Sequence, residues 1–227
     1  MPPRAISPYP TLGARHLVPW PGGTAAFPFD GRARVRRYRF ARAAVTRGLR
    51  ALGIGPGDDV LVPAFHHGVE VEAVRATGAR PLPYPIGADL CLRVSEVERR
   101  VTETTRAVYA THYFGFPQPA AALRALCDRR GLVLLEDCAL ALGSEDGGRP
   151  LGTLGDLAVF CLYKTLPVPD GGLLVVRDGR PAPPDLGLLA RARSLRPRPD
   201  VRERAGHPDF HPVQLDRAMS PLTRLAL

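Results

Sequence analysis

The chain has 227 residues, of which 45% are hydrophobic and 23% are charged, and this is enough apolar material for one sizeable core. No apolar run approaches the roughly 20 residues of a membrane span, and the N-terminus has no apolar signal segment, so we expect a cytoplasmic protein without membrane association. The net charge of +9 would suit nucleic-acid binding, but the arginines are scattered along the chain, so no nucleic-acid partner is expected.

Residues 1–36 are rich in Pro, Gly and Arg and are expected to form an irregular lead-in. Beyond them, short apolar segments alternate with segments of helical periodicity. The expected helices cover 37–53, 69–76, 95–101 (capped by Ser95) and 120–130, and the expected strands cover 60–63, 80–84, 106–111 and 132–135. This alternation predicts an α/β fold with a mostly parallel central sheet flanked by helices on both faces.

The rhythm changes after Gly152. Two apolar segments, 156–162 and 172–176, have no room for a crossover helix between them, so an antiparallel pair or a tight loop is expected. The following Pro- and Arg-rich segment allows a short helix at 186–194, and residues 213–227 are expected to form a last helix.

The composition singles out one lysine. Lys164 is the sole lysine among 31 basic residues, the rest being arginine. Arginine replaces lysine wherever only charge matters, but its guanidinium stays protonated and forms no imine. Lys164 is therefore a candidate for amine chemistry, with a chance surface residue as the alternative.

Lys164 follows the apolar strand 156–162 and precedes a Pro/Gly loop. Asp137 ends the segment LVLLED and is expected at the carboxyl edge of the same sheet, where ligands bind in open α/β proteins. A carboxylate there suits a protonated pyridine nitrogen, although a simple loop cap is the alternative.

Further polar residues follow other predicted strands. His66 and His67 offer rings for a flat cofactor, or are an ordinary loop pair. His112 follows the strand 106–111, with a core or capping histidine as the alternative. The first helix begins near Arg42, where free N–H groups suit a phosphate, or is simply basic in its first turn.

The cysteines do not indicate a metal. None stands in a CxxC or zinc-type spacing, so we expect free, reduced thiols and no metal site. The four are Cys91, Cys127, Cys138 and Cys161.

Four segments in this order resemble the DegT/StrS-type sugar aminotransferases, which are pyridoxal phosphate (PLP) enzymes of fold type I. They are GIGPGDDVLVPAF, THYFGFPQP, GLVLLEDCALALGS and GDLAVFCLYKTLPVPDGGLLV, and the resemblance covers residues 37–178. It implies that 37–178 form a PLP-binding large domain. Residues 179–227 are then a Pro/Arg-rich segment and C-terminal helix, truncated relative to the family.

The resemblance also implies roles for individual residues. Lys164 matches the catalytic lysine that forms a Schiff base with PLP, and Asp137 matches the carboxylate that pairs with the pyridine nitrogen. His67 stands where the family has a ring stacked on PLP, with His66 beside it.

The remaining matches concern the phosphate and the strand ends. Ala41 and Arg42 fall on the turn that holds the phosphate, and His112 matches a histidine at a central strand end. Cys161 stands where the family usually has a phosphate-binding serine. The chain contains no Asn, so the family's phosphate contact from an Asn of a partner subunit is missing.

The activity implied is transfer of an amino group from an amino acid, usually glutamate, to a keto-sugar that is often nucleotide-linked. The family works as a homodimer. The alternative is a catalytically silent or truncated relative that acts as a binding or regulatory partner.

Overall fold

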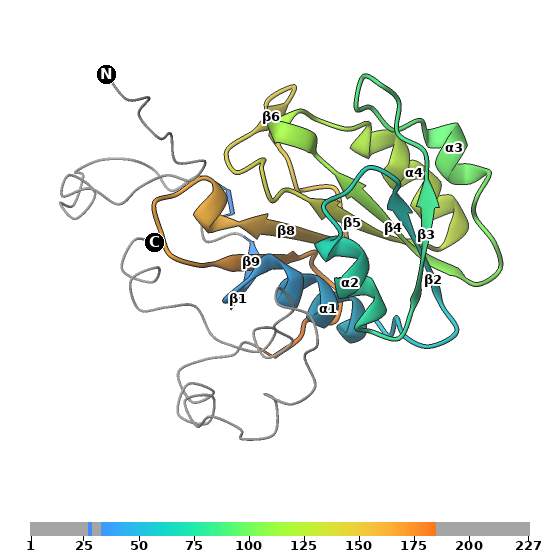
Figure 1. The fold of residues 1–227 in the computed structure, drawn as a ribbon, viewed down its shortest axis with the longest axis horizontal. Helices are drawn as coiled ribbons and strands as arrows, with labels where there is room; N and C mark the ends of the chain where they lie inside the picture. Colours follow the sequence, from blue (N-terminus) through green and yellow to red (C-terminus); the bar gives the residue numbers. More distant parts are fainter. Residues whose placement is uncertain (1–26, 29–32, 185–227) are drawn as a thin grey trace, which may run out of the picture.

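The computed structural model describes residues 27–28 and 33–184. Their main feature is a seven-stranded sheet in the order β1-β9-β8-β5-β4-β2-β3 (Figure 1). Neighbouring strands are parallel except at β9, which runs antiparallel to β1 and β8. The strands are β1 (Arg34–Tyr38), β2 (Asp59–Pro63), β3 (Arg80–Tyr84), β4 (Thr105–Thr111), β5 (Val133–Asp137), β8 (Leu157–Cys161) and β9 (Gly172–Val176).

Helices cover both faces of this sheet, which confirms the predicted α/β class (Figure 1). Helices α1 (Ala41–Ala51) and α2 (Val69–Arg75) share a core with one face. Helices α3 (Val94–Glu98) and α4 (Ala120–Arg130) share a core with the other face. Within the described residues, no helix is long and apolar enough to cross a membrane.

Shorter elements follow strands β4, β5 and β8. The two-stranded hairpin β6–β7 was not expected from the sequence, and neither were two 3₁₀ turns, η2 and η3. Their bounds are β6 (Glu145–Asp146), β7 (Arg149–Pro150), η2 (Tyr113–Gly115) and η3 (Leu162–Lys164).

The beginning of the described chain differs from the sequence prediction. Residues 34–38 form β1, so the irregular lead-in is wrong at 34–36, and the helix expected from Arg37 begins at Ala41. The reason is pairing with a distant strand: Tyr38 lies opposite Gly172, and Phe40 is still extended (φ −134°, ψ 149°).

Two further details complete the comparison. Helix α3 begins after Arg93 with no side-chain cap, so the expected Ser95 cap is wrong. The pair β8–β9 confirms the expected antiparallel arrangement. The remaining lead-in residues and the two helices expected after residue 185 lie outside the described residues.

Candidate cofactor site

The candidate site lies where the parallel strands end. Thr111, the last residue of β4, pairs with Asp137, the last residue of β5, and Asp137 pairs with Val159 of β8. Side chains alternate along a strand, so Asp137 faces the same side as Leu135, which packs under α1 and α2. The site is therefore built on the α1/α2 face of the carboxyl-terminal edge.

Asp137 is buried, at 4% exposure, and two donors hold its carboxylate. The Tyr109 hydroxyl donates to Oδ2 at 2.6 Å, and the Ala139 N–H donates to Oδ1 at 2.8 Å. Burial raises the pKa of Asp137, and the charge of Glu70 adds to this, whereas the two hydrogen bonds and the charge of Lys164 lower it.

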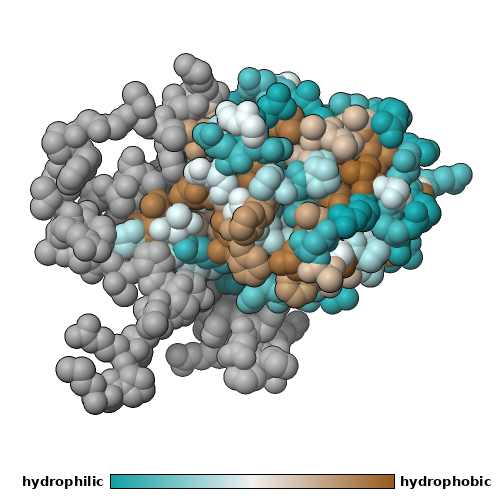
Figure 2. Space-filling model, turned by 90° about the horizontal axis from the view of Figure 1, so that it is seen from above, coloured by the Kyte–Doolittle hydropathy of each residue, from teal (hydrophilic) through white to brown (hydrophobic). Residues whose placement is uncertain are grey.

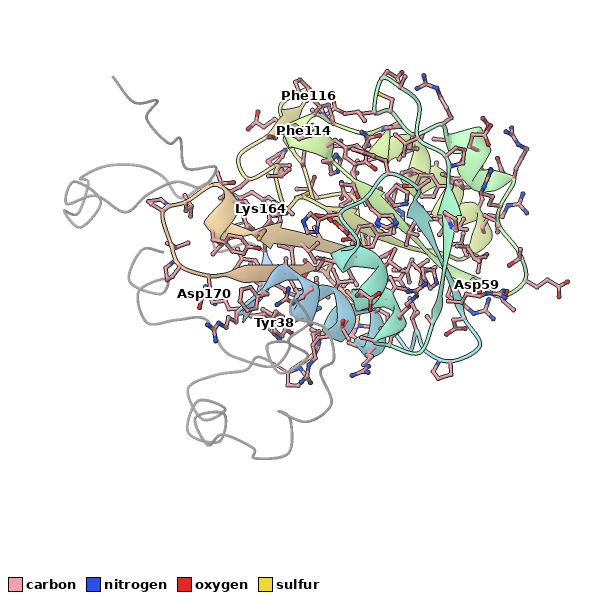
Figure 3. The ribbon with its side chains drawn as sticks, viewed as in Figure 1. Tyr38, Asp59, Phe114, Phe116, Lys164 and Asp170 are labelled. Carbon is pink, nitrogen blue, oxygen red and sulfur yellow. The ribbon has the colours of Figure 1, made fainter. Side chains whose placement is uncertain are left out.

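Lys164 ends η3, directly after β8, and is half-buried. Figure 3 shows it at the carboxyl end of β8, away from Asp59 at the amino end of β2. Its charge acts on both the Asp137 carboxylate and the Cys161 thiol. Burial raises the pKa of Cys161, while Tyr163 and Lys164 oppose that rise. The structure thus brings the lysine, the buried acid and the thiol together.

The lysine loop is fixed against the start of α1. The N–H of Gly171 donates to the Arg39 carbonyl at 2.7 Å, and the Arg39 guanidinium lies 3.5 Å from the buried Asp170 carboxylate. A Cβ atom on Gly172 would collide with the backbone of Phe40. Only glycine therefore allows the start of β9 to approach this helix so closely.

Ala41 and Arg42 form the first turn of α1. The first N–H groups of a helix have no partner within it, and they favour an anion. The Arg42 guanidinium stacks on the Phe40 ring at 4.6 Å, and this ring meets Tyr163 edge-on at 6.3 Å. The arrangement offers N–H groups and positive charge beside Lys164.

His66 and His67 lie in the loop between β2 and α2, at the same edge of the sheet, and both are exposed. The backbone of this loop is anchored, because the Tyr113 hydroxyl donates to the Phe65 carbonyl at 2.6 Å. The described contacts do not give either ring a stacking partner within the chain.

His112 differs from the expectation of a cofactor contact. It is buried at 1% exposure, its Nδ1 accepts from the Gln118 N–H at 3.1 Å, and its Nε2 lies 3.0 Å from Glu136 Oε2. Both ring nitrogens are thus engaged within the protein. The histidine supports Glu136 on the opposite face of β5, because adjacent strand residues point to opposite sides.

Sequence reasoning missed three polar residues around this edge. Glu136 accepts backbone N–H groups from Gly152 and Leu154 and so holds the loop before β8. Tyr109 and Glu70 act on Asp137. A tyrosine inside a buried strand was the available signal, because its hydroxyl needs a partner on that face.

Comparisons with known proteins agree with this geometry. The profile of the DegT/DnrJ/EryC1/StrS aminotransferase family matches residues 41–184. A GDP-perosamine synthase from Vibrio cholerae is 39% identical over 56% of this chain and 35% of its own length. A dTDP-3-amino-3,4,6-trideoxy-alpha-D-glucose transaminase from Streptomyces venezuelae is 42% identical over 67% of this chain and 40% of its own.

Solved structures show the same fold. DesV from S. venezuelae has a TM-score of 0.64 at 34% identity, covering 85% of this chain and 50% of DesV. NtdA from Bacillus subtilis, solved with its cofactor PMP (pyridoxamine phosphate), has a TM-score of 0.59 at 25% identity, covering 64% of this chain and 33% of NtdA.

These relatives show how much of a family member the chain covers and which cofactor the family uses. The chain spans well under half the length of the curated relatives described above. The family and the PMP of NtdA indicate PLP as the cofactor. Three groups at the strand ends fit PLP: the Lys164 amine, the buried Asp137 carboxylate, and the N-terminus of α1, against which Gly172 packs with no room for a Cβ. The chain belongs to the DegT/DnrJ/EryC1/StrS aminotransferase family.

Proposed function

We propose that this chain is the PLP-binding part of a sugar aminotransferase, with residues 37–178 as its large domain. It would take an amino group from an amino acid, glutamate in our proposal, and transfer it to a nucleotide-linked keto-sugar. The observation that carries this proposal is the half-buried Lys164 within electrostatic reach of buried Asp137. Relatives named for GDP- and dTDP-linked sugars support the acceptor class.

Bound PLP would supply an electron sink for the amino-group carbon. Lys164 Nζ would hold the cofactor and then, once freed, move a proton to and from the substrate carbon. Asp137 would face the ring nitrogen and keep a proton on it through its negative charge. Burial strengthens this pairing, since charges interact more strongly away from water.

The other proposed contacts surround these two. The first turn of α1, with Ala41 and Arg42, would bind the phosphate together with the Cys161 thiol. The exposed His67 ring would stack on the cofactor, with His66 beside it as the second choice.

We also propose that the chain works as a homodimer in the cytoplasm. Apolar residues gather in patches on the face seen in Figure 2. The large apolar side chains that are exposed in the described part all lie in carboxyl-edge loops, and exposed apolar patches favour association. They are Phe65, Phe114, Phe116 and Leu140. All four cysteines are free thiols, which supports a reducing compartment.

The decisive experiment is chemical labelling of the full chain. PLP is added, the visible absorption band is recorded, and borohydride reduction is followed by peptide mapping. We expect the label on Lys164 and its loss in Lys164→Arg, which keeps the charge but forms no imine. Formation of PMP from added glutamate would support the aminotransferase, whereas a label without PMP would favour a catalytically silent relative. A label elsewhere, or none, would overturn the cofactor site.

A further inference from the structure

Tyr109 is in direct contact with the buried acid of the site. It lies within β4, is 1% exposed, and donates its hydroxyl to Asp137 Oδ2 at 2.6 Å. Burial and the charge of Asp137 hold the pKa of Tyr109 well above its ordinary value. The hydroxyl therefore stays protonated and acts as a donor that favours the carboxylate form of Asp137.

Glu70 approaches the same place from another element. It is the second residue of α2, and its Oε2 atom is buried without a hydrogen-bond partner among the described residues. Its charge acts on Asp137, Tyr109 and Tyr113; burial, with a smaller contribution from this charge, raises the pKa of Tyr113 to about 12. A buried carboxylate oxygen without a donor is costly, so its presence here calls for an explanation.

Other groups around Asp137 also favour or disfavour its ionised form. The Lys164 charge from η3 and the Ala139 N–H favour the carboxylate, as Tyr109 does. The Cys161 thiol from β8 lies within electrostatic reach as well. Glu70 is the negative charge that opposes ionisation of Asp137. Groups from β4, α2, η3 and the loop after β5 thus act on this acid.

We propose that Tyr109 and Glu70 are positioning residues with opposite effects on Asp137: Tyr109 stabilises its carboxylate, and Glu70 disfavours it. Together they set the proton affinity of the one buried acid that, under the proposed function, faces the ring nitrogen of the cofactor. The role toward the ring nitrogen rests on the proposed function, whereas the opposite effects of Tyr109 and Glu70 on Asp137 do not depend on it.

The first test needs no cofactor. The chain is labelled with [¹³Cγ]aspartate, the Asp137 signal is assigned with Asp137→Asn, and its titration is followed by NMR. Tyr109→Phe removes a hydrogen bond to a carboxylate, so we expect the pKa of Asp137 to rise by about one unit or more. Glu70→Gln removes a nearby like charge, so we expect a fall of about half a unit or more.

Matched controls separate this effect from general loss of packing. Tyr84→Phe removes another buried hydroxyl, one that donates to the Tyr109 carbonyl, and Glu72→Gln neutralises an exposed acid on the same helix. Both controls should leave the Asp137 titration within about 0.2 unit of the wild type. Shifts of equal sign in Tyr109→Phe and Glu70→Gln, or equal shifts in the controls, would overturn the proposal.

The second test follows PLP affinity against pH by absorbance. Affinity should rise with pH as Asp137 ionises, with the midpoint moved upward in Tyr109→Phe and downward in Glu70→Gln. If labelling of Lys164 fails while the opposite NMR shifts are found, the proposed function falls and the pairing stands. If labelling succeeds while the opposite shifts are absent, the pairing falls and the proposed function stands.

Discussion

Asp156 is a buried acid that lies away from the candidate site and accepts three hydrogen bonds. It precedes β8 and is fully buried. Its Oδ2 accepts from Arg124 Nη1 at 2.7 Å and from the Leu134 N–H at 2.8 Å, and its Oδ1 accepts from Arg180 Nε at 2.8 Å. These bonds connect β8 with α4, β5 and the segment after β9. Replacing this carboxylate should therefore loosen the sheet without touching Lys164.

The loss in free energy of unfolding follows from the groups that Asp156→Ala leaves without a partner. The Leu134 N–H loses its acceptor, which costs about 1–3 kcal/mol when the group is buried. Arg124, which is 8% exposed, loses its buried partner, and breaking such a pair costs about 3–5 kcal/mol. These two losses overlap, so we expect a total of about 3–5 kcal/mol, a large part of the 5–15 kcal/mol typical of a domain.

The assay is equilibrium urea unfolding followed by circular dichroism. Asp128→Ala is the matched control, because Asp128 pairs with the same Arg124 at 2.8 Å but is 60% exposed. Exposed pairs contribute about 1 kcal/mol at most. If Asp156→Ala and Asp128→Ala lowered the free energy of unfolding equally, our account of Asp156 would be refuted.

The pH dependence has a definite sign. Burial alone would raise the pKa of Asp156, but hydrogen bonds from the Leu134 N–H, Arg124 and Arg180 lower it below its ordinary value. The stabilisation is therefore complete above the unfolded pKa of about 3.9 and is lost as the pH falls through the folded value. The difference between wild type and Asp156→Asn should stay constant from about pH 7 to 5 and shrink below about pH 4.

Two further predictions concern the edges of the site. Gly172→Ala places a Cβ against the first turn of α1, so we expect a loss of about 1–3 kcal/mol in unfolding free energy and weaker PLP binding. Gly55→Ala, whose Cβ would lie 3.6 Å from its nearest neighbour, is the control, and equal effects would contradict the predicted clash. For self-association, light scattering should show a dimer that the double variant Phe114→Asn, Phe116→Ser converts to monomer at unchanged thermal stability. A monomeric wild type would contradict the proposed dimer.

The parallel core was predictable because its signals are local. The run Arg80–Tyr84 lies between turn residues and matches β3 as predicted, and Ala120–Arg130 matches α4. Gly131 ends that helix in the left-handed conformation, φ 65°, which a glycine adopts without strain. Where the hydrophobic periodicity and a stop signal coincide, the sequence is sufficient to predict the element and its end.

Strand β1 was missed because its cause is distant. Its residues, RVRRY, are rich in arginine and carry no apolar alternation to compete with the helical pattern that follows. The strand forms because β9, more than 130 residues later, offers a complete edge from Gly172 to Val176. Such pairing is decided by tertiary structure, which overrides local propensity.

The site residues divide in the same way. Lys164 and Asp137 could be proposed from the sequence because each is a reactive group directly after a predicted strand. Tyr109 and Glu70 were missed, since their importance depends on which face of β4 and which end of α2 lie beside Asp137. His112 was misplaced for the same reason: its position after a strand is local information, but the direction of its ring is not.

The adjacent acids of β5 show how one strand separates support from chemistry. Glu136 and Asp137 point to opposite faces, because strand side chains alternate. Glu136 is satisfied on its own face by the N–H groups of Gly152 and Leu154 and by His112. A carboxylate has about four acceptor positions, and Asp137 shows two donors within the described residues. Glu136 is therefore committed to the fold, whereas Asp137 keeps acceptor capacity at the edge where Lys164 lies, as its proposed pairing with a protonated ring nitrogen requires.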